Sequence, residues 1–302
     1  MQTLYTLSAM DPMQARKSQQ QQGAEILNDK ISRSLDLFTT AIQYIISIAQ
    51  YAETDAHLKA SKYLPSQADL AIDTKIAGNE FIWAVLGNET FKERVKQGNL
   101  ERFVDAEWVK KLYIALVKSP EYATYIGIKE RVLKSEKVIV QFVWEKLMLG
   151  NESLQEFFTD EMQGWEDDRE MIIMLMENFF RSYQKVNFLN LLTSEKREYA
   201  QDLLKTVLDK EDYTMELIKP RLVNWEAERV ALIDLILLRM GVCELLYFPT
   251  IPTKVTINEY IEIAKMYSTP QSGQFVNGVL DNILKDLEKN DQIRKQERTR
   301  KP

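Results

Sequence analysis

Residues 225–247, WEAERVALIDLILLRMGVCELLY, decide the fold that this sequence predicts. From Val230 onward the apolar residues leave almost no polar helix face, namely Val230, Leu232, Ile233, Leu235, Ile236, Leu237, Leu238, Met240, Val242, Leu245 and Leu246. A helix that is apolar all round is either a membrane span or the buried centre of a larger fold. Charges at Asp234, Arg239 and Glu244 exclude the span. We therefore predict a buried central helix over 225–247.

The three charges on this helix cannot share one solvated stripe. They are five residues apart, which turns each about 140° from the one before it. A charge on a buried helix is costly unless it is paired. Two interpretations stay open: Asp234, Arg239 and Glu244 pair within the core, or one or more of them reaches a partner-binding surface.

The rest of the chain is also predicted to be helical. With 302 residues, 45% hydrophobic content and only 10 Gly and 8 Pro, it has enough apolar side chains for a large core and few helix breakers. Apolar residues recur at spacings of three and four. The expected helices cover 24–51, 105–118 (capped by Asp105), 130–149, 168–189, 194–209 and 211–219.

Two further helices are expected after the central one. Thr256-Ile257-Asn258-Glu259 has the pattern of a capping box, with Thr256 at the N-cap and Glu259 three residues later. The next helix is expected to open at Thr269-Pro270 or at Ser272 and to carry Phe275. After Leu287 the apolar periodicity stops, so we expect a frayed or disordered basic tail.

The residue types argue against enzyme chemistry. His57 is the only histidine and Cys243 the only cysteine, which leaves no catalytic triad, CxxC metal site or intramolecular disulfide. A Met- and Phe-rich stretch near 171–180 is most simply core. We expect no catalytic residue, no metal and no cofactor. The net charge of −6 argues against a protein that coats nucleic acid through charge alone.

Within Arg229–Asp281, five pieces of sequence occur in a specific order and spacing. They are DLILLR (234–239), ELL (244–246), PTKVTINE (252–259), IEIAK (261–265) and SGQFVNGVLD (272–281). Together they resemble the carboxy-terminal signature of the NusB family, and Met1–Tyr5 is similar to its Gln-x-Leu-Tyr first helix. The resemblance implies an all-α, NusB-like bundle with two helical subdomains, here with extra helices in the N-terminal two-thirds.

The same resemblance implies a cytoplasmic transcription antitermination factor. Such factors pair with NusE, a small-subunit ribosomal protein, and bind boxA RNA in the RNA polymerase antitermination complex of ribosomal RNA operons. It places Asp234 on the NusE-binding side, and the other two charges of the central helix, Arg239 and Glu244, are further candidates for that surface. It places the region of Ser272 and Phe275 near the RNA; Asn277 lies in the same motif, and Lys254 and Lys265 are candidate cations for phosphate contacts. Phe275 could stack on a base, although packing against Val279 is an equal alternative.

Two departures from the family affect these expectations. The family carries an arginine-rich arm before its first motif, and an in-frame basic stretch upstream of Met1 would supply it. The chain is also about twice the usual length. We therefore expect an N-terminal helical region with a long insertion (1–220), a NusB-like core (221–288) and a basic tail (289–302). No apolar run reaches the ~20 residues of a membrane span.

Two other functions remain as alternatives. The missing arm and the acidic balance favour a helical protein–protein scaffold that has lost RNA binding. The same fold also serves as the RNA-binding part of an RNA cytosine methyltransferase. That enzyme needs a Rossmann-like domain and a catalytic cysteine downstream, and this sequence shows neither a glycine-rich strand–helix turn nor the ~200 further residues of such a domain.

Overall fold

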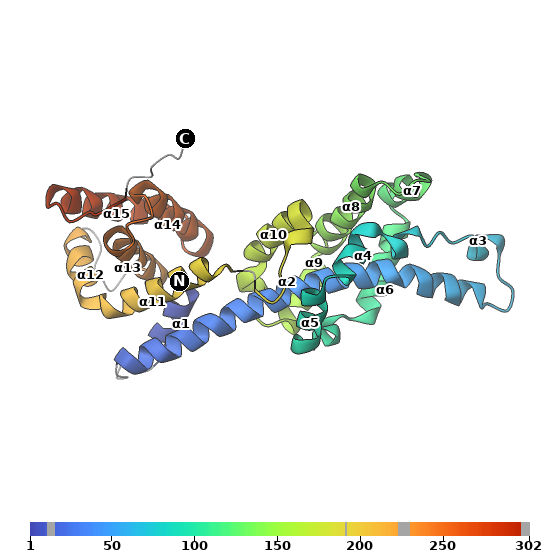
Figure 1. Ribbon diagram of the computed structural model, residues 1–302, viewed down its shortest axis with the longest axis horizontal. Helices are drawn as coiled ribbons and strands as arrows, with labels where there is room; N and C mark the ends of the chain where they lie inside the picture. The colour runs from blue at the N-terminus through green and yellow to red at the C-terminus, as the bar shows by residue number, and fades with distance from the viewer. Residues whose placement is uncertain (11–15, 191, 223–229, 297–302) are drawn as a thin grey trace. The chain divides into compact units, whose positions relative to one another are not determined.

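The computed structural model describes residues 1–10, 16–190, 192–222 and 230–296, and these residues are largely helical (Figure 1). No strand occurs among them, so the all-α prediction is confirmed. The chain divides into two compact units: unit 1 comprises 1–30 and 192–302, and unit 2 comprises 31–191. The division differs from the expected boundary at residue 220, which falls inside unit 1.

Unit 1 is arranged around one helix, α13 (Leu232–Tyr247), which contacts α1, α11, α12, α14 and α15. The helices of unit 1 are α1 (Gln2–Ser8), the beginning of α2 (Arg16–Ala60), α11 (Ser194–Asp209), α12 (Glu211–Ile218), α13, α14 (Thr253–Tyr267) and α15 (Ser272–Lys289), with a 3-10 turn, η5 (Lys219–Arg221). Because α11 and α12 pack on α13, the residues before 220 belong with the C-terminal helices. The prediction of a buried central helix is confirmed from Leu232; its expected start at 225–229 lies outside the described residues.

Gly241 shows how closely the helices of unit 1 approach one another. A Cβ atom at this position would lie 2.9 Å from Leu280 Cδ1 on α15 and 3.4 Å from the Tyr260 ring on α14. Contacts under about 3 Å force the neighbouring atoms to move, so a side chain at this position would displace the buried methyl groups of Leu280. The glycine therefore permits the tight packing of the central helix.

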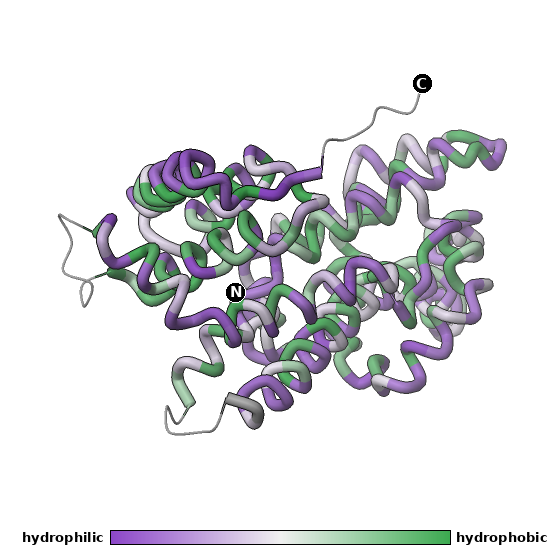
Figure 2. The backbone as a smooth tube through the Cα atoms, turned by 60° about the vertical axis from the view of Figure 1, so that its left-hand side comes forward, coloured by the Kyte–Doolittle hydropathy of each residue, from purple (hydrophilic) through white to green (hydrophobic). Residues whose placement is uncertain are grey.

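Unit 2 surrounds the part of α2 that follows Lys30. Its other elements are α3 (Gln67–Leu70), η1 (Lys75–Gly78), α4 (Glu80–Leu86), α5 (Glu89–Gly98), η2 (Leu100–Phe103), α6 (Ala106–Val117), α7 (Pro120–Gly127), α8 (Leu133–Phe142), the π-helical turn η3 (Val143–Met148), α9 (Glu152–Glu161), α10 (Trp165–Ser182) and η4 (Tyr183–Lys185). Buried rings such as Phe38, Phe81 and Phe179 meet edge to face at 5.4–5.9 Å. Figure 2 shows hydrophilic and hydrophobic residues alternating along most helices, as amphipathic helices require.

Several predicted helix limits differ from those observed. Helix α2 runs from Arg16 to Ala60 rather than over 24–51, because no proline interrupts it before Pro65. The helix expected over 130–149 begins at Leu133 and changes to π-helical geometry at Val143. By contrast, α11 matches its prediction, and Asp105 caps α6 by accepting a hydrogen bond from Trp108 N at 2.8 Å. No helix among the described residues is both long and apolar enough to span a membrane.

Candidate functional site

The three charged residues of α13 point in different directions and meet different sets of neighbouring helices, as their spacing requires. Asp234 meets α15, Arg239 meets α11 and α12, and Glu244 meets α11 and α14. Asp234 and Glu244 are buried, with 6% and 4% of their surface exposed. Arg239 thus forms an ion pair within unit 1, whereas Asp234 and Glu244 accept hydrogen bonds from neutral hydroxyl groups among the described residues. Whether any of them also contacts a partner stays a prediction.

Glu244 is held by three hydroxyl groups. Thr256 Oγ1 donates to its Oε1 at 2.6 Å, Tyr260 OH donates to its Oε2 at 3.2 Å, and Tyr199 OH also donates to Oε2. Burial raises the pKa of both Tyr199 and Tyr260 above the usual value, and the adjacent Glu244 carboxylate raises it further. Both phenols therefore stay protonated and remain donors. We refer to these four residues as the Glu244 cluster.

This cluster corrects the predicted capping box. Helix α14 begins at Thr253, with Pro252 at its N-cap, so Thr256 lies inside the helix. The Thr256 side chain is fully buried and donates to Glu244 instead of accepting from a backbone N–H. The Thr-x-x-Glu pattern was misleading because a buried carboxylate needed the threonine as a donor. The role of Tyr199 could not be read from the sequence, since it lies 45 residues before Glu244.

Asp234 and Ser272, which the sequence assigned to two different surfaces, contact each other. Ser272 Oγ donates to Asp234 Oδ2 at 2.7 Å, and it accepts from Thr269 N at 3.2 Å. Ser272 is buried at the start of α15. Asp234 Oδ1 is also buried and has no hydrogen-bond partner among the described residues. We refer to this contact as the Asp234–Ser272 junction; it leaves one carboxylate oxygen with unused accepting capacity.

Arg239 forms its ion pair and its hydrogen bond within unit 1. Its guanidinium forms an ion pair with Glu211 Oε1 at 3.1 Å and donates to the Val207 carbonyl oxygen at 3.4 Å. Only 13% of the Arg239 side chain is exposed. Arg239 therefore links α13 to α11 and α12, and little of it is accessible to a partner.

The structure brings together only some of the predicted RNA-binding residues. Lys265 lies against the start of α15, because a Cβ atom on Gly273 would come within 2.9 Å of Lys265 Cγ. Lys265 also pairs with Glu262 at 2.7 Å, and it sits next to the Asp234–Ser272 junction. Lys254 lies eleven residues earlier on α14, about 16 Å along the helix axis. Lys254 and Lys265 therefore cannot contact the same phosphate.

Phe275 and Asn277 lie on opposite flanks of α15. They are two residues apart, which separates their directions by about 160°. Phe275 is partly buried and packs against the hydrophobic core of unit 1, whereas Asn277 is exposed. Phe275 therefore packs against the core, as one of the two interpretations expected, and stacking on a base stays a prediction. A single base cannot contact both residues.

The chain after α15 is docked as far as the structure describes it. Lys295 Nζ donates to the carbonyl oxygens of Glu244 and Phe248 at 2.8 and 2.9 Å. Gln296 N donates to Pro249 O at 2.9 Å, and Ile293 packs against the core of unit 1. The expectation of a frayed tail is wrong for residues 290–296, because Lys295 caps the last turn of α13. Residues 297–302 lie outside the described part.

A pocket of about 780 Å³ opens beside the Glu244 cluster. Leu4 of α1, Tyr199 and Leu203 of α11, and Val255 and Tyr260 of α14 contribute to its walls, and the buried Glu244 is also among the lining residues. Most of the lining is apolar, with Lys196 and Glu259 as the charged groups besides Glu244. This pocket could not be predicted from the sequence, because its walls come from five separate stretches of the chain.

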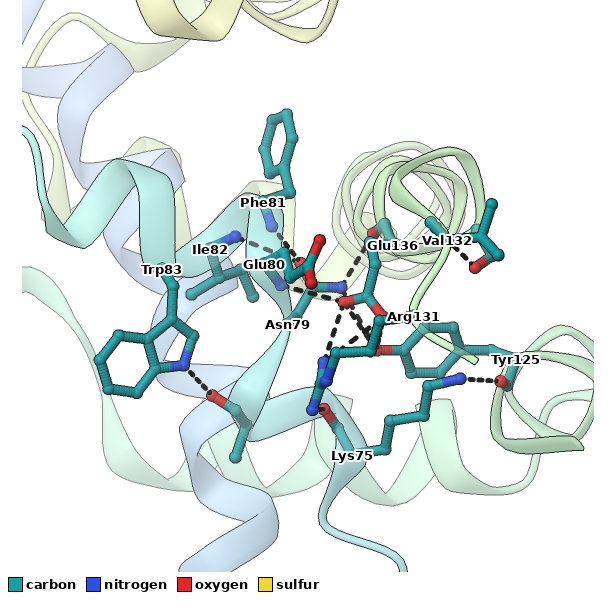
Figure 3. Close-up of polar contacts among 12 residues, drawn as sticks. Lys75, Asn79, Glu80, Phe81, Ile82, Trp83, Tyr125, Arg131, Val132 and Glu136 are labelled. Carbon is teal, nitrogen blue, oxygen red and sulfur yellow. Dashed lines mark hydrogen bonds and ion pairs between the residues drawn. The ribbon is translucent and has the colours of Figure 1, made fainter. Parts of the chain in front are cut away.

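Unit 2 contains a second buried carboxylate, shown in Figure 3. Glu136 is fully buried and accepts from Glu80 N at 3.0 Å, from Tyr125 OH, and from the Arg131 guanidinium at 3.3 Å. Asn79 donates to the Glu136 carbonyl oxygen at 2.9 Å and caps α4 by accepting from Phe81 N. Each polar group here has a partner, so we interpret the network as structural.

Comparison with known proteins assigns a relationship to the second half of the chain. Residues 152–285 match the family model described as "NusB family". Proteins named "Transcription antitermination protein NusB" are similar over 91–95 residues: 50% identity with that of Salinibacter ruber, 42% with Methylacidiphilum infernorum and 40% with Listeria monocytogenes. These stretches cover 30–32% of this chain and 57%, 66% and 73% of the relatives. No solved structure matches.

Proposed function

The chain belongs to the NusB family, and from that membership we propose that it is an RNA-binding transcription antitermination factor. The observation that carries the proposal is the 50% identity to a protein named for this role. In the proposed function, the chain pairs with NusE and binds boxA RNA in the cytoplasm. The pair joins the RNA polymerase antitermination complex and supports transcription of ribosomal RNA.

The Asp234–Ser272 junction is the proposed contact point for NusE. Its Oδ1 atom is buried and has no donor among the described residues, so a NusE contact that moves the side chains covering Asp234 and supplies an N–H or O–H group would satisfy this acceptor. Because Asp234 is almost fully buried, Asp234→Lys would disturb the packing of α13, and Asp234→Asn is the cleaner variant. It keeps the shape of the side chain and removes the charge.

Asp234→Asn is expected to weaken NusE binding by about 1–3 kcal/mol, because a charged acceptor is replaced by a neutral one. Isothermal titration calorimetry of the full chain with NusE measures this difference. Asp281→Asn is the matched control, since Asp281 is an exposed carboxylate of the same unit, paired with Lys285. Equal NusE affinity for a well-folded Asp234→Asn variant and the wild type would remove Asp234 from the interface.

Binding of boxA RNA is expected to be weak for this chain alone and stronger with NusE. Phosphate contacts supply most non-specific affinity, and few cations near the start of α15 are free, since Lys265 is paired with Glu262. Phe275→Leu keeps an apolar side chain against the core but removes the aromatic face. We expect it to cost about 1–3 kcal/mol of RNA binding if the ring stacks on a base.

Fluorescence anisotropy with labelled boxA RNA at two salt concentrations, with and without NusE, tests this proposal. Each phosphate contact should change the logarithmic salt slope by roughly 0.7. Asn277→Ala, on the opposite flank of α15, distinguishes loss of stacking from general weakening. Absence of RNA binding even with NusE would favour the scaffold alternative, for which the net charge of −6 is the supporting observation.

A further inference from the structure

Unit 2 ends in an exposed apolar projection. In residues 58–70, here called the tip, Tyr63 is 97% exposed and Leu64 83% exposed, and Leu58 and Leu70 are exposed by more than half. Figure 1 shows α3 and its flanking loops standing apart from the other helices of unit 2. Single exposed apolar residues are ordinary, but a group of four on one projection marks an interaction surface.

The shape of the tip does not depend on these apolar side chains. Ser66 caps α3, with Asp69 N donating to Ser66 Oγ at 3.1 Å and Ser66 N donating to Asp69 Oδ2 at 3.0 Å. Lys62 Nζ pairs with Asp69 Oδ1 at 2.7 Å. No residue of α3 is buried. Polar contacts therefore order the turn, while Tyr63 and Leu64 remain in solvent at a cost that a partner would relieve.

An apolar groove of about 360 Å³ lies between α7 and α8 on the same unit. Its wall includes Ile128, Val132 and Val138, and the last two are 45% and 53% exposed. Glu121 and Lys134 stand at its rim, and neither forms an ion pair with another described residue. The groove thus offers an apolar floor with one anion and one cation beside it.

The tip and the groove lie at the same end of unit 2. Tyr122 OH on α7 donates to Asp73 O at 3.2 Å, and Lys75 Nζ donates to Tyr125 O at 2.8 Å. These contacts hold the segment that follows the tip against α7, and α7 forms one wall of the groove. In a closed dimer that exchanges tips about a twofold axis, each tip–groove contact would be made twice.

We propose that the tip of one copy docks in the α7–α8 groove of a second copy. The charges favour this occupant over a polyanion, because Lys59 and Lys62 at the tip are already paired with Asp55 and Asp69. With Asp55 counted, the tip carries two Lys–Asp pairs and no net charge, and the groove is likewise neutral with Glu121 and Lys134, so an apolar contact between them brings no excess charge together. The contact is small, so the dimer is expected to be weak and to depend on concentration.

Sedimentation equilibrium of the full chain over a wide concentration range tests the proposal. The wild type should show a monomer–dimer equilibrium. Tyr63→Ser combined with Leu64→Ser changes only exposed positions, and Val138→Asp places a charge in the groove. Each is expected to raise the dissociation constant about tenfold or more, as loss of a central apolar contact does. Met174→Ser, at a residue 53% exposed on α10, is the matched control and should leave dimerisation unchanged.

Mixing the two variants gives the decisive result. The tip of the groove variant and the groove of the tip variant are intact, so the mixture should form heterodimers through one remaining contact. A disulfide between Leu64→Cys of one copy and Val138→Cys of another, formed with oxidised glutathione, should link two chains. A wild type that stays monomeric, a dimer insensitive to either variant, or no cross-link between positions 64 and 138 would each overturn the proposal.

Discussion

The two units each bury one glutamate, and they stabilise it by different means. In unit 2, Glu136 has a cation, Arg131, and the first backbone N–H of α4 as donors. In unit 1, Glu244 has only hydroxyl donors, from Tyr199, Thr256 and Tyr260. An ion pair and a backbone donor at the start of a helix hold the two helices of unit 2 together and indicate a structural role. The Glu244 side chain instead accepts from neutral groups among the described residues, and the nearby Lys295 ammonium donates to the Glu244 carbonyl oxygen rather than to the carboxylate.

This difference separates a structural site from a candidate functional one. The Glu136 network is closed, because its donors and acceptors satisfy one another (Figure 3). The Glu244 cluster borders the pocket of unit 1, and at the other end of α13 Asp234 Oδ1 has no hydrogen-bond partner among the described residues. Unit 1 therefore carries the groups that remain open to a partner, in agreement with the family match over its helices.

Two built-in probes allow the units to be followed separately. Four of the five tryptophans, Trp83, Trp108, Trp144 and Trp165, lie in unit 2. The only cysteine, Cys243, is buried in unit 1, and burial raises the pKa of its thiol to about 12. Thiol labelling at pH 8 therefore reports the opening of unit 1. Tryptophan fluorescence reports unit 2, in a background that carries Trp225→Phe.

Glu136→Ala is expected to have the largest effect on stability. It leaves the Arg131 cation, the Tyr125 hydroxyl and Glu80 N without their acceptor in a buried site. Removal of one partner from a buried pair costs about 3–5 kcal/mol. Urea unfolding followed by tryptophan fluorescence should show this loss in unit 2. Cys243 labelling in the absence of denaturant should stay slow.

Glu121→Ala, at an exposed carboxylate near the same helices, is the control for Glu136→Ala and should change stability little. If Glu136→Ala accelerated Cys243 labelling as much as it lowered the fluorescence transition, the two units would unfold as one. That outcome would contradict the interpretation that Glu136 stabilises unit 2 alone.

Glu244→Ala is expected to be somewhat less costly and to act on the other unit. Three hydroxyl groups lose an acceptor, and each unsatisfied buried group costs about 1–3 kcal/mol, less where water from the pocket replaces the carboxylate. We expect a total loss of about 2–4 kcal/mol in unit 1. Cys243 should label faster, while the tryptophan transition of unit 2 stays in place. Thr256→Val, which removes one donor and keeps the volume, should give a fraction of this effect.

The sequence predicted the central helix well and its contacts poorly, for a physical reason. Helix α11 and the cap of α6 follow from local periodicity and from the side chain of Asp105, so they were predicted correctly. Spacing alone showed that Asp234, Arg239 and Glu244 face different directions. It could not show which helices meet them, because those partners are distant in sequence. Thr256 was misassigned because a local capping pattern competed with a tertiary hydrogen bond.

The predicted functional surfaces were separated for the same reason. Asp234 and Ser272 are 38 residues apart, and the family resemblance assigned them to protein and RNA binding respectively. Only the packing of α13 on α15 brings them within 2.7 Å. The Glu136 network and the tip escaped prediction, since neither produces a motif. The sequence around Tyr63 and Leu64 shows no recognisable pattern, and only their exposure in the structure indicates an interaction surface.

Lys295→Ala is expected to have the smallest effect, confined to the segment docked after α15. The ammonium group donates to two carbonyl oxygens at the end of α13, and the loss of such contacts costs about 1 kcal/mol. Hydrogen exchange of residues 290–296 should become faster, while exchange within α13 changes little.

Burial lowers the pKa of Lys295 below its ordinary 10.5. The folded state therefore binds fewer protons than the unfolded state just below pH 10.5, and the free energy of unfolding increases as the pH rises through that window.

Lys289→Ala, at an exposed lysine in the last turn of α15, is the matched control and should leave the hydrogen exchange of residues 290–296 unchanged. Equal exchange in the Lys295→Ala variant and the wild type would mean that Ile293 and the Gln296 backbone hold the segment without the lysine.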